Sequence, residues 1–129
     1  MSNNEITFVI ECEVQPGRSA DFDALVPVLE AAAREFPGTV EYCWYAGPTP
    51  TSRGLVERYR DSDATLEHIQ AFSAELTPRY LETVTIKSVT MIGPASDELN
   101  AQLAPFFDGA VPDVKATWYR PVEAGSTAS

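Results

Sequence analysis

The sequence predicts an α+β protein with the element order β-α-β-β-α-β, followed by one more helix and strand. Three observations lead to this prediction. Several short stretches alternate apolar residues with other residues, as half-buried strands do. Between them, apolar residues recur every three or four positions, as in amphipathic helices. Proline and glycine fall between the two kinds of pattern, where the chain must turn. The first six elements are those of a split βαβ, or ferredoxin-like, unit: an antiparallel four-stranded sheet with two helices on one face.

The first third of the chain predicts a strand, a helix and a second strand. Residues 6–14 alternate so that one strand face carries Ile6, Phe8, Ile10, Cys12 and Val14. Ser19 is of a type that caps helices, and apolar residues at helical spacing then continue until Pro37 and Gly38. Residues 39–46 (TVEYCWYA) are rich in aromatic and β-branched side chains, which is typical of a strand.

The middle of the chain predicts a third strand and a second helix. After a connection over 47–54, residues 55–59 alternate as a strand. Residues 61–63 (DSD) are types that accept hydrogen bonds from the free N–H groups of a helix start. The apolar residues after them recur at helical spacing, so we expect a helix that runs to about Glu75.

The last third predicts a short helical turn, a strand, a helix and a fifth strand. Thr77 and Pro78 begin the turn, because proline is well tolerated in the first turn of a helix. Residues 83–92 are β-branched and predict a strand. Ser96 is expected to cap a short amphipathic helix, and residues 113–120 to form the fifth strand.

Composition and charge narrow the function classes. The chain has 129 residues, 44% of them hydrophobic and 22% charged, which predicts one globular domain over 1–121 and a flexible tail over 122–129. A net charge of −10 repels phosphates and anionic lipids, so we expect binding neither to nucleic acid nor to a membrane. The start, MSNNEITF, lacks the pattern of a signal peptide, which favours a cytoplasmic location.

The two cysteines and the one histidine do not form a metal-binding pattern. Cys12 and Cys43 lie in separate predicted strands, without a CxxC motif or a paired histidine. Buried cysteines most often act as small hydrophobic residues. We therefore expect no metal site and no disulfide.

The predicted strands carry apolar residues on both faces, as in Phe8 beside Val9 and in the run Cys43–Tyr45. A sheet with one face in water should alternate cleanly, and two helices cover only one face. We therefore predict a homodimer through the open sheet face, with the fifth strand reaching across to the partner.

Three residues that carry chemistry are expected to converge between the sheet and the second helix. Glu57 and Tyr59 share one face of the third strand. His68 falls at the edge of the apolar stripe of the helix that follows. A carboxylate, a phenol and an imidazole in one apolar space are suited to moving a proton.

Residues 5 to about 120 resemble the antibiotic-biosynthesis monooxygenase family of dimeric α+β barrel proteins. The resemblance rests on the element order, on the passage ERYRD at 57–61, and on His68 in the helix after it. It implies a cavity between helices and sheet. It also implies oxidation of an aromatic or quinol-type substrate by O₂ without a metal, flavin or haem. The fold alone does not settle the chemistry.

The candidate catalytic residues are His68, as the base, and Glu57, which orients it or binds a substrate hydroxyl. The alternative is that His68 is a satisfied polar group at a helix edge and Glu57 a paired carboxylate. The candidate substrate-binding residues are aromatic side chains that also suit a core or an interface: Tyr59, Trp44, Phe72, Tyr42 and Tyr80.

Two functions follow from these residues. One is a cofactor-independent monooxygenase that acts on a phenolic, quinol or polyketide-like aromatic compound. The other is a small-ligand-binding or accessory protein of the same fold without catalysis. An open cavity with His68 and Glu57 facing inward favours the first, and a cavity filled by its own aromatic residues favours the second.

Overall fold

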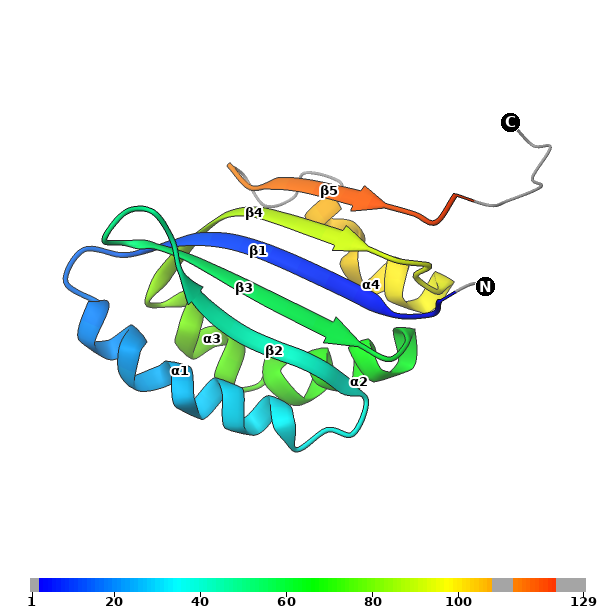
Figure 1. Cartoon of the computed structure of the whole chain (residues 1–129), viewed down its shortest axis with the longest axis horizontal. Helices are drawn as coiled ribbons and strands as arrows, with labels where there is room; N and C mark the ends of the chain where they lie inside the picture. Colours follow the sequence, from blue (N-terminus) through cyan, green and yellow to red (C-terminus); the bar gives the residue numbers. More distant parts are fainter. Residues whose placement is uncertain (1–2, 108–112, 123–129) are drawn as a thin grey trace.

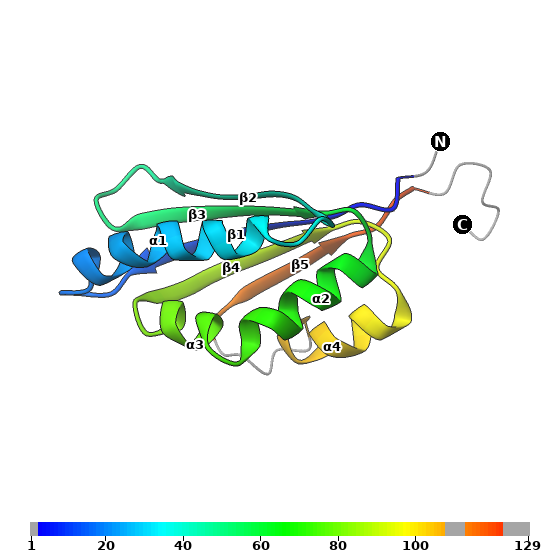
Figure 2. The ribbon, with the colours of Figure 1, turned by 90° about the horizontal axis from the view of Figure 1, so that it is seen from below.

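The computed structural model describes residues 3–107 and 113–122 of the chain. One curved five-stranded sheet holds the helices of this part of the chain on a single side (Figure 1, Figure 2). In chain order the elements are β1 (Ile6–Val14), α1 (Ser19–Arg34), β2 (Thr39–Ala46), β3 (Ser52–Tyr59), α2 (Ser62–Ser73), α3 (Leu76–Leu81), β4 (Val84–Ile92), α4 (Asp97–Phe107) and β5 (Lys115–Tyr119). This order confirms the predicted α+β, ferredoxin-like fold class with its C-terminal α-β extension.

The sheet has the strand order β2-β3-β1-β4-β5. The first four strands pair antiparallel, as a split βαβ unit requires. β5 lies parallel to β4 of the same chain, with Met91 opposite Trp118. In the structure this strand extends the sheet of its own chain, and its predicted contact with a partner stays a prediction. The predicted tail lies outside the described residues, apart from Val122.

Two helix caps agree with the sequence and one does not. Asp61 accepts a hydrogen bond from the backbone N–H of Ala64 at 2.9 Å and begins α2. Ser96 Oγ accepts from the N–H of Leu99 at 3.2 Å and begins α4. Ser19, in contrast, is the first residue of α1, and the N-cap position falls on Arg18, whose side chain makes no capping bond.

β3 begins at Ser52, three residues before the predicted start. The sequence placed these residues in a loop because Gly54 and the prolines before it are typical of a turn. In the structure Ser52 pairs with β1, and Arg53 and Gly54 pair with both β1 and β2. A central strand gains hydrogen bonds on both edges, and these outweigh the weak local preference of Gly54.

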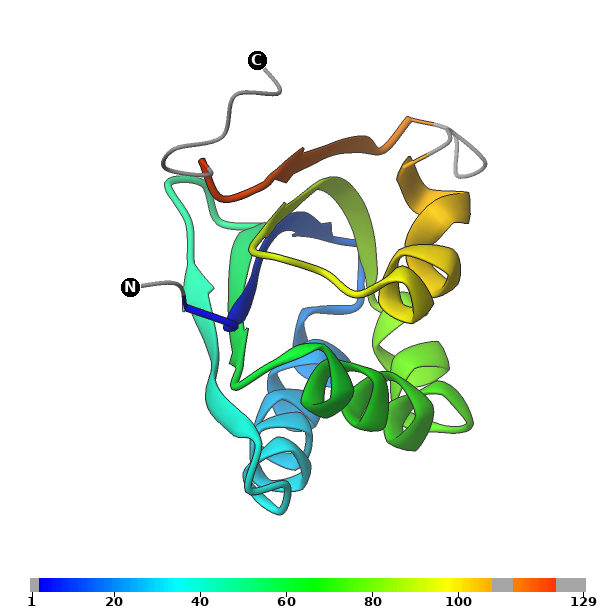
Figure 3. The ribbon, with the colours of Figure 1, turned by 90° about the vertical axis from the view of Figure 1, so that its right-hand side faces the viewer.

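The core lies between the inner sheet face and the helices. The burial of β1 alternates along its length, with the predicted apolar face turned inward. The largest side chains that are almost fully buried include Tyr59, Phe22, Leu29, Leu55, Met91 and Leu99. Seen from the end of the sheet, the strands curve around the helices (Figure 3). This curvature leaves room between β1–β4 and α2 for the cavity described below.

The outer sheet face carries an apolar row bordered by charges. Cys43, Val56, Val9 and Thr90 stand opposite one another on β2, β3, β1 and β4, and each is half-buried. The face also holds the ion pairs of Arg58 with Glu41 (3.4 Å) and Glu5 (3.8 Å). A homodimer through this face stays a prediction. No helix in the described part of the chain is long and apolar enough to cross a membrane.

Gly93 fixes the junction between β4 and the C-terminal extension. Its φ is +137°, a conformation that side chains disfavour, and a Cβ there would lie 2.3 Å from the carbonyl oxygen of Glu5. Its N–H donates to the carbonyl of Tyr119 at 3.0 Å, and its carbonyl accepts from Trp118 Nε1 at 3.1 Å.

We therefore expect Gly93→Ala to lower the free energy of unfolding by about 1–3 kcal/mol, because the strained backbone has no room to relax. Urea denaturation measures the change. Gly54→Ala is the matched control, since no heavy atom lies within 4 Å of the added Cβ. Equal stability of the two variants would contradict the role assigned to Gly93.

Candidate functional site

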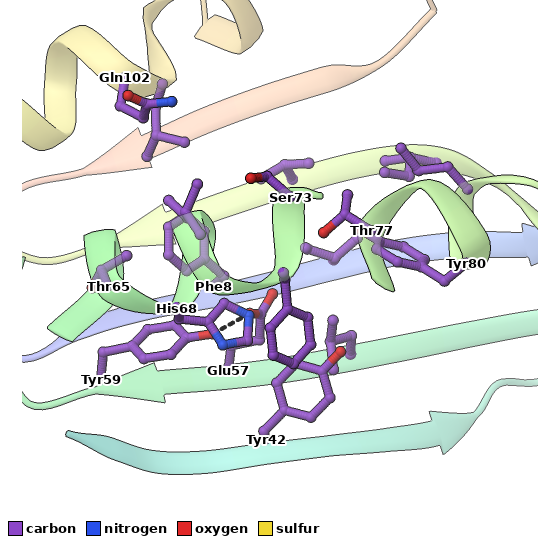
Figure 4. Close-up of a pocket in the computed structure, with 18 residues that line it drawn as sticks. Phe8, Tyr42, Glu57, Tyr59, Thr65, His68, Ser73, Thr77, Tyr80 and Gln102 are labelled. Carbon is purple, nitrogen blue, oxygen red and sulfur yellow. Dashed lines mark hydrogen bonds and ion pairs between the residues drawn. The ribbon is translucent and has the colours of Figure 1, made fainter. Parts of the chain in front are cut away.

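A cavity of about 240 Å³ lies between the inner sheet face and the helices α2, α3 and α4 (Figure 4). Its walls are mainly apolar and come from β1 to β4 as well as from these helices. The lining residues that are exposed are Ser73, Leu81 and Gln102, which belong to α2, α3 and α4. The cavity therefore opens to solvent between α4 and the α2–α3 pair.

Glu57, Tyr59 and His68 meet on the inner wall of this cavity (Figure 4). The Tyr59 hydroxyl donates a hydrogen bond to Glu57 Oε1. His68 Nε2 lies 3.4 Å from the same oxygen. Residues two apart on a strand share a face, which brings Glu57 and Tyr59 together, and the Asp61 cap starts α2 so that His68 turns toward them. The convergence expected from the sequence is present.

Glu57 is 8% exposed, and its environment favours the neutral acid. Burial raises the pKa of this carboxyl from 4.5 to about 7, and the hydrogen bond from Tyr59 limits the rise. Both contacts of the carboxyl use Oε1, so Oε2 has no partner among the described residues. Glu57 therefore gains or loses its proton near neutral pH. It does so on the wall of a cavity that has room for a ligand.

His68 is 6% exposed, and its environment favours the neutral imidazole. Burial lowers its pKa from 6.5 to about 4. Between about pH 4 and 7 the 3.4 Å contact with Glu57 therefore joins a neutral acid to a neutral imidazole, and is no ion pair. His68 Nδ1 is buried and has no hydrogen-bond partner among the described residues.

Aromatic rings surround the imidazole. The ring centroid of Phe72 lies 3.9 Å from that of His68, Tyr59 lies at 5.0 Å and Tyr42 at 5.6 Å. Phe72 and Tyr42 also contact each other at 5.9 Å. These residues line the cavity, and burial raises the pKa of the Tyr42 and Tyr59 hydroxyls. The wall thus presents apolar ring faces and the protonated phenol of Tyr42 to a ligand.

The two remaining predicted binding residues have different positions. Tyr80 lines the cavity from α3. Trp44 does not line it and instead packs edge-on against Phe22 at 5.2 Å and Tyr80 at 5.9 Å, in a second buried cluster. Tyr59, predicted as a ligand contact, uses its hydroxyl to bond Glu57.

Several lining residues were missed at the sequence level. Thr65 precedes His68 by one helical turn, and this i, i+3 spacing places it on the same helix face. Ser73, Thr77 and Gln102 line the cavity near its opening. No local signal identifies Gln102, because its place depends on how α4 packs. Among residues 3–107 and 113–122, no group of three or more His, Cys, Asp or Glu side chains could hold a metal ion.

Comparisons with known proteins identify the fold of this chain. No family model matches the sequence, and no curated protein matches it significantly. The structure of MupZ from Pseudomonas fluorescens is similar over 98% of this chain and 97% of its own, with 20% identity and a TM-score of 0.76. That span includes α4 and β5.

Two further structures are similar over a shorter part of the chain. SnoaB, a cofactor-independent oxygenase from Streptomyces nogalater, covers 72% of this chain and 95% of its own, with 18% identity and a TM-score of 0.58. A candidate antibiotic biosynthesis monooxygenase from Nitrosomonas europaea covers 75% and 96%, with 13% identity and a TM-score of 0.64. The chain therefore has the fold of the antibiotic-biosynthesis monooxygenase-like proteins, as the sequence predicted.

Proposed function

We propose that this protein, with its antibiotic-biosynthesis monooxygenase-like fold, oxidises a small phenolic or quinol-type aromatic compound with O₂, using Glu57 as the base. The observation that carries the proposal is the carboxyl of Glu57, whose pKa is about 7, on the wall of an apolar cavity lined by aromatic rings. The fold shared with SnoaB, a cofactor-independent oxygenase, supports the reaction class.

We infer that Glu57, rather than His68, acts as the base. The sequence favoured His68, but an imidazole with a pKa of about 4 is a weak base at neutral pH. Glu57 changes protonation near pH 7, so its carboxylate is present and basic just above that pH. His68 is then the neighbour that orients Glu57 and packs against the substrate ring. Tyr59 donates to Glu57 in both states.

The reaction starts when the Glu57 carboxylate takes the proton of a substrate hydroxyl. The resulting phenolate passes one electron to O₂, and the two radicals join in a peroxide bond at a ring carbon. The peroxide takes up a proton and becomes a hydroperoxide. Loss of water, with the hydrogen of that carbon, breaks the O–O bond and leaves a carbonyl. One oxygen atom of O₂ thus enters the product and the other leaves as water.

The surrounding residues favour this chemistry. An apolar cavity excludes water, which strengthens the interaction of the phenolate with nearby hydrogen-bond donors. Because the pKa of the Tyr42 hydroxyl is raised, it keeps its proton and can donate. We also propose that two copies of the protein associate through the outer sheet face, since that face carries the apolar row defined above.

A second candidate function is ligand binding without catalysis. The observation that favours it is the close packing of His68 among Phe72, Tyr59 and Tyr42, which also suits a histidine that merely completes a core. In that case the cavity would hold an aromatic ligand and leave it unchanged.

Oxygen uptake by purified, chelator-treated protein with a panel of hydroquinones and naphthols separates the two functions. We expect uptake by the wild-type protein and at least a tenfold decrease in His68→Ala, because the variant loses the partner of Glu57 and a wall of the cavity. Glu67→Ala is the matched control, since Glu67 is exposed on the same helix. Binding of the panel without uptake would support the second function and refute the first.

A further inference from the structure

Polar groups line the cavity at its buried wall and near its opening, where Gln102 stands with Ser73 and Thr77. Glu57, Tyr59 and His68 form the buried end described above. Gln102 lies across the cavity from them, on α4 (Figure 4). The rest of the lining is mainly apolar. A ligand that fills the cavity therefore meets Glu57 and its neighbours at the buried wall, Gln102 near the opening, and mainly apolar surface elsewhere.

The packing of α4 determines where Gln102 stands. The backbone N–H of Ser96 donates to Ser62 Oγ at 2.9 Å, which joins the start of α4 to the start of α2. Leu99 is fully buried in the core. Gln102 and Leu103 follow Leu99 at i+3 and i+4, so they share its face of the helix and line the cavity.

The Gln102 carboxamide is available to a ligand. It makes no hydrogen bond or ion pair with any described residue. A carboxamide offers two N–H donors and one carbonyl acceptor, which suits a hydroxyl or carbonyl group. None of the described lining residues is a lysine or arginine, and the protein has a net charge of −10. A carboxylate or phosphate at this end would therefore lack a counter-charge.

The size of the cavity limits the ligand. Benzene fills an apolar cavity of about 150 Å³ in a protein core. A cavity of about 240 Å³ has room for roughly two fused rings, with the substituent at the outer end extending toward the opening.

We propose that Gln102 of the C-terminal extension determines specificity by binding a second, uncharged polar group of the substrate. The ligand is then a flat, neutral aromatic compound of about two rings, with an ionisable hydroxyl at the Glu57 end and a hydroxyl or carbonyl at the Gln102 end. The inference rests on the proposed role of this cavity as the substrate site.

Calorimetric titration under anaerobic conditions tests the inference without turnover. The probes are 2-naphthol, 2,6-dihydroxynaphthalene and 6-hydroxy-2-naphthoate. We expect the diol to bind the wild-type protein about fivefold more tightly than 2-naphthol, a modest factor because water competes at an exposed amide. The naphthoate should bind most weakly. In Gln102→Leu, which keeps the approximate volume, the diol should keep over 2-naphthol only the statistical advantage of its two equivalent hydroxyls.

Gln70→Leu is the matched control, because Gln70 is exposed on α2 and does not line the cavity. Its preference for the diol should equal that of the wild type. The inference is wrong if Gln102→Leu keeps that preference, if the naphthoate binds as tightly as the diol, or if none of the probes binds. A preference that depends on Gln102 in a protein without oxygen uptake would refute the proposed oxidation and leave the ligand class standing.

Discussion

Replacing Glu57 with glutamine is expected to lower the turnover of a phenolic substrate by about a hundredfold or more, the usual contribution of a general base. Glutamine has the shape of the acid, so its amide can still accept from Tyr59 and contact His68. It cannot take a proton. The loss therefore reports on proton transfer rather than on the shape of the cavity.

The pH dependence of the wild-type enzyme should identify the same group. The Glu57 carboxyl titrates at about 7 in the free protein, and only the ionised form is a base. We expect kcat/KM to rise with pH through about 7 and then to level off until the substrate itself ionises. The residual activity of Glu57→Gln should lack this rise.

Steady-state rates between pH 5 and 9 measure both effects. Glu67→Gln is the control, because it makes the same chemical change at an exposed position on α2. If Glu57→Gln retained more than a tenth of the activity with an unchanged pH profile, Glu57 would not be the base.

The same substitution should stabilise the protein at alkaline pH. Burial raises the pKa of Glu57 from 4.5 to about 7, so between these values the folded state holds a proton that the unfolded state has lost. Stability therefore falls as the pH rises through this window. At 1.36 kcal/mol per unit of pKa, the ionised carboxylate costs on the order of 3 kcal/mol above pH 7. Glutamine at this position avoids that cost.

We expect the difference in unfolding free energy between Glu57→Gln and the wild type to be near zero at pH 4 and to increase from about pH 4.5 to 7. It should reach about 3 kcal/mol at pH 8. Urea denaturation at a series of pH values measures it. An equal difference at pH 4 and pH 8 would show that folding leaves the pKa of Glu57 unchanged.

In the wild-type protein, His68 should have the opposite effect on how stability changes with pH. Its pKa is lowered from 6.5 to about 4, so the unfolded state holds the extra proton in that window and stability rises with pH. The two contributions have opposite signs where their windows overlap, between about pH 4.5 and 6.5. The wild type should therefore show a nearly flat profile there, and Glu57→Gln a rising one.

Loss of the carboxylate would thus lower activity and raise stability. Such a trade-off is common at functional sites, where a buried group is kept in a state that the fold disfavours. A residue that only completed the core would show no such opposition. The two measurements together therefore test whether Glu57 belongs to a site.

Local patterns in the sequence were sufficient for most of the fold. Alternation placed Ile6, Phe8 and Ile10 on one face of β1, and Asp61 and Ser96 marked the starts of α2 and α4. These signals are reliable because a strand repeats every two residues and a helix every 3.6, and because a cap is made by residues close in sequence. These patterns give the order of strands and helices, and that order was enough to predict the antiparallel sheet and the ferredoxin-like fold.

The tertiary structure alone decided the pairing of β5, the place of Trp44 and the surroundings of Glu57 and His68. β5 pairs with β4 of its own chain, and Trp44 packs on Phe22 in the second buried cluster. The sequence placed Glu57 and His68 together, but only their burial in the structure raises the pKa of Glu57 and lowers that of His68. The pKa of each group depends on its burial and hydrogen bonds, which come from residues that are distant in the sequence. A strand or helix pattern, which is local, therefore does not predict it.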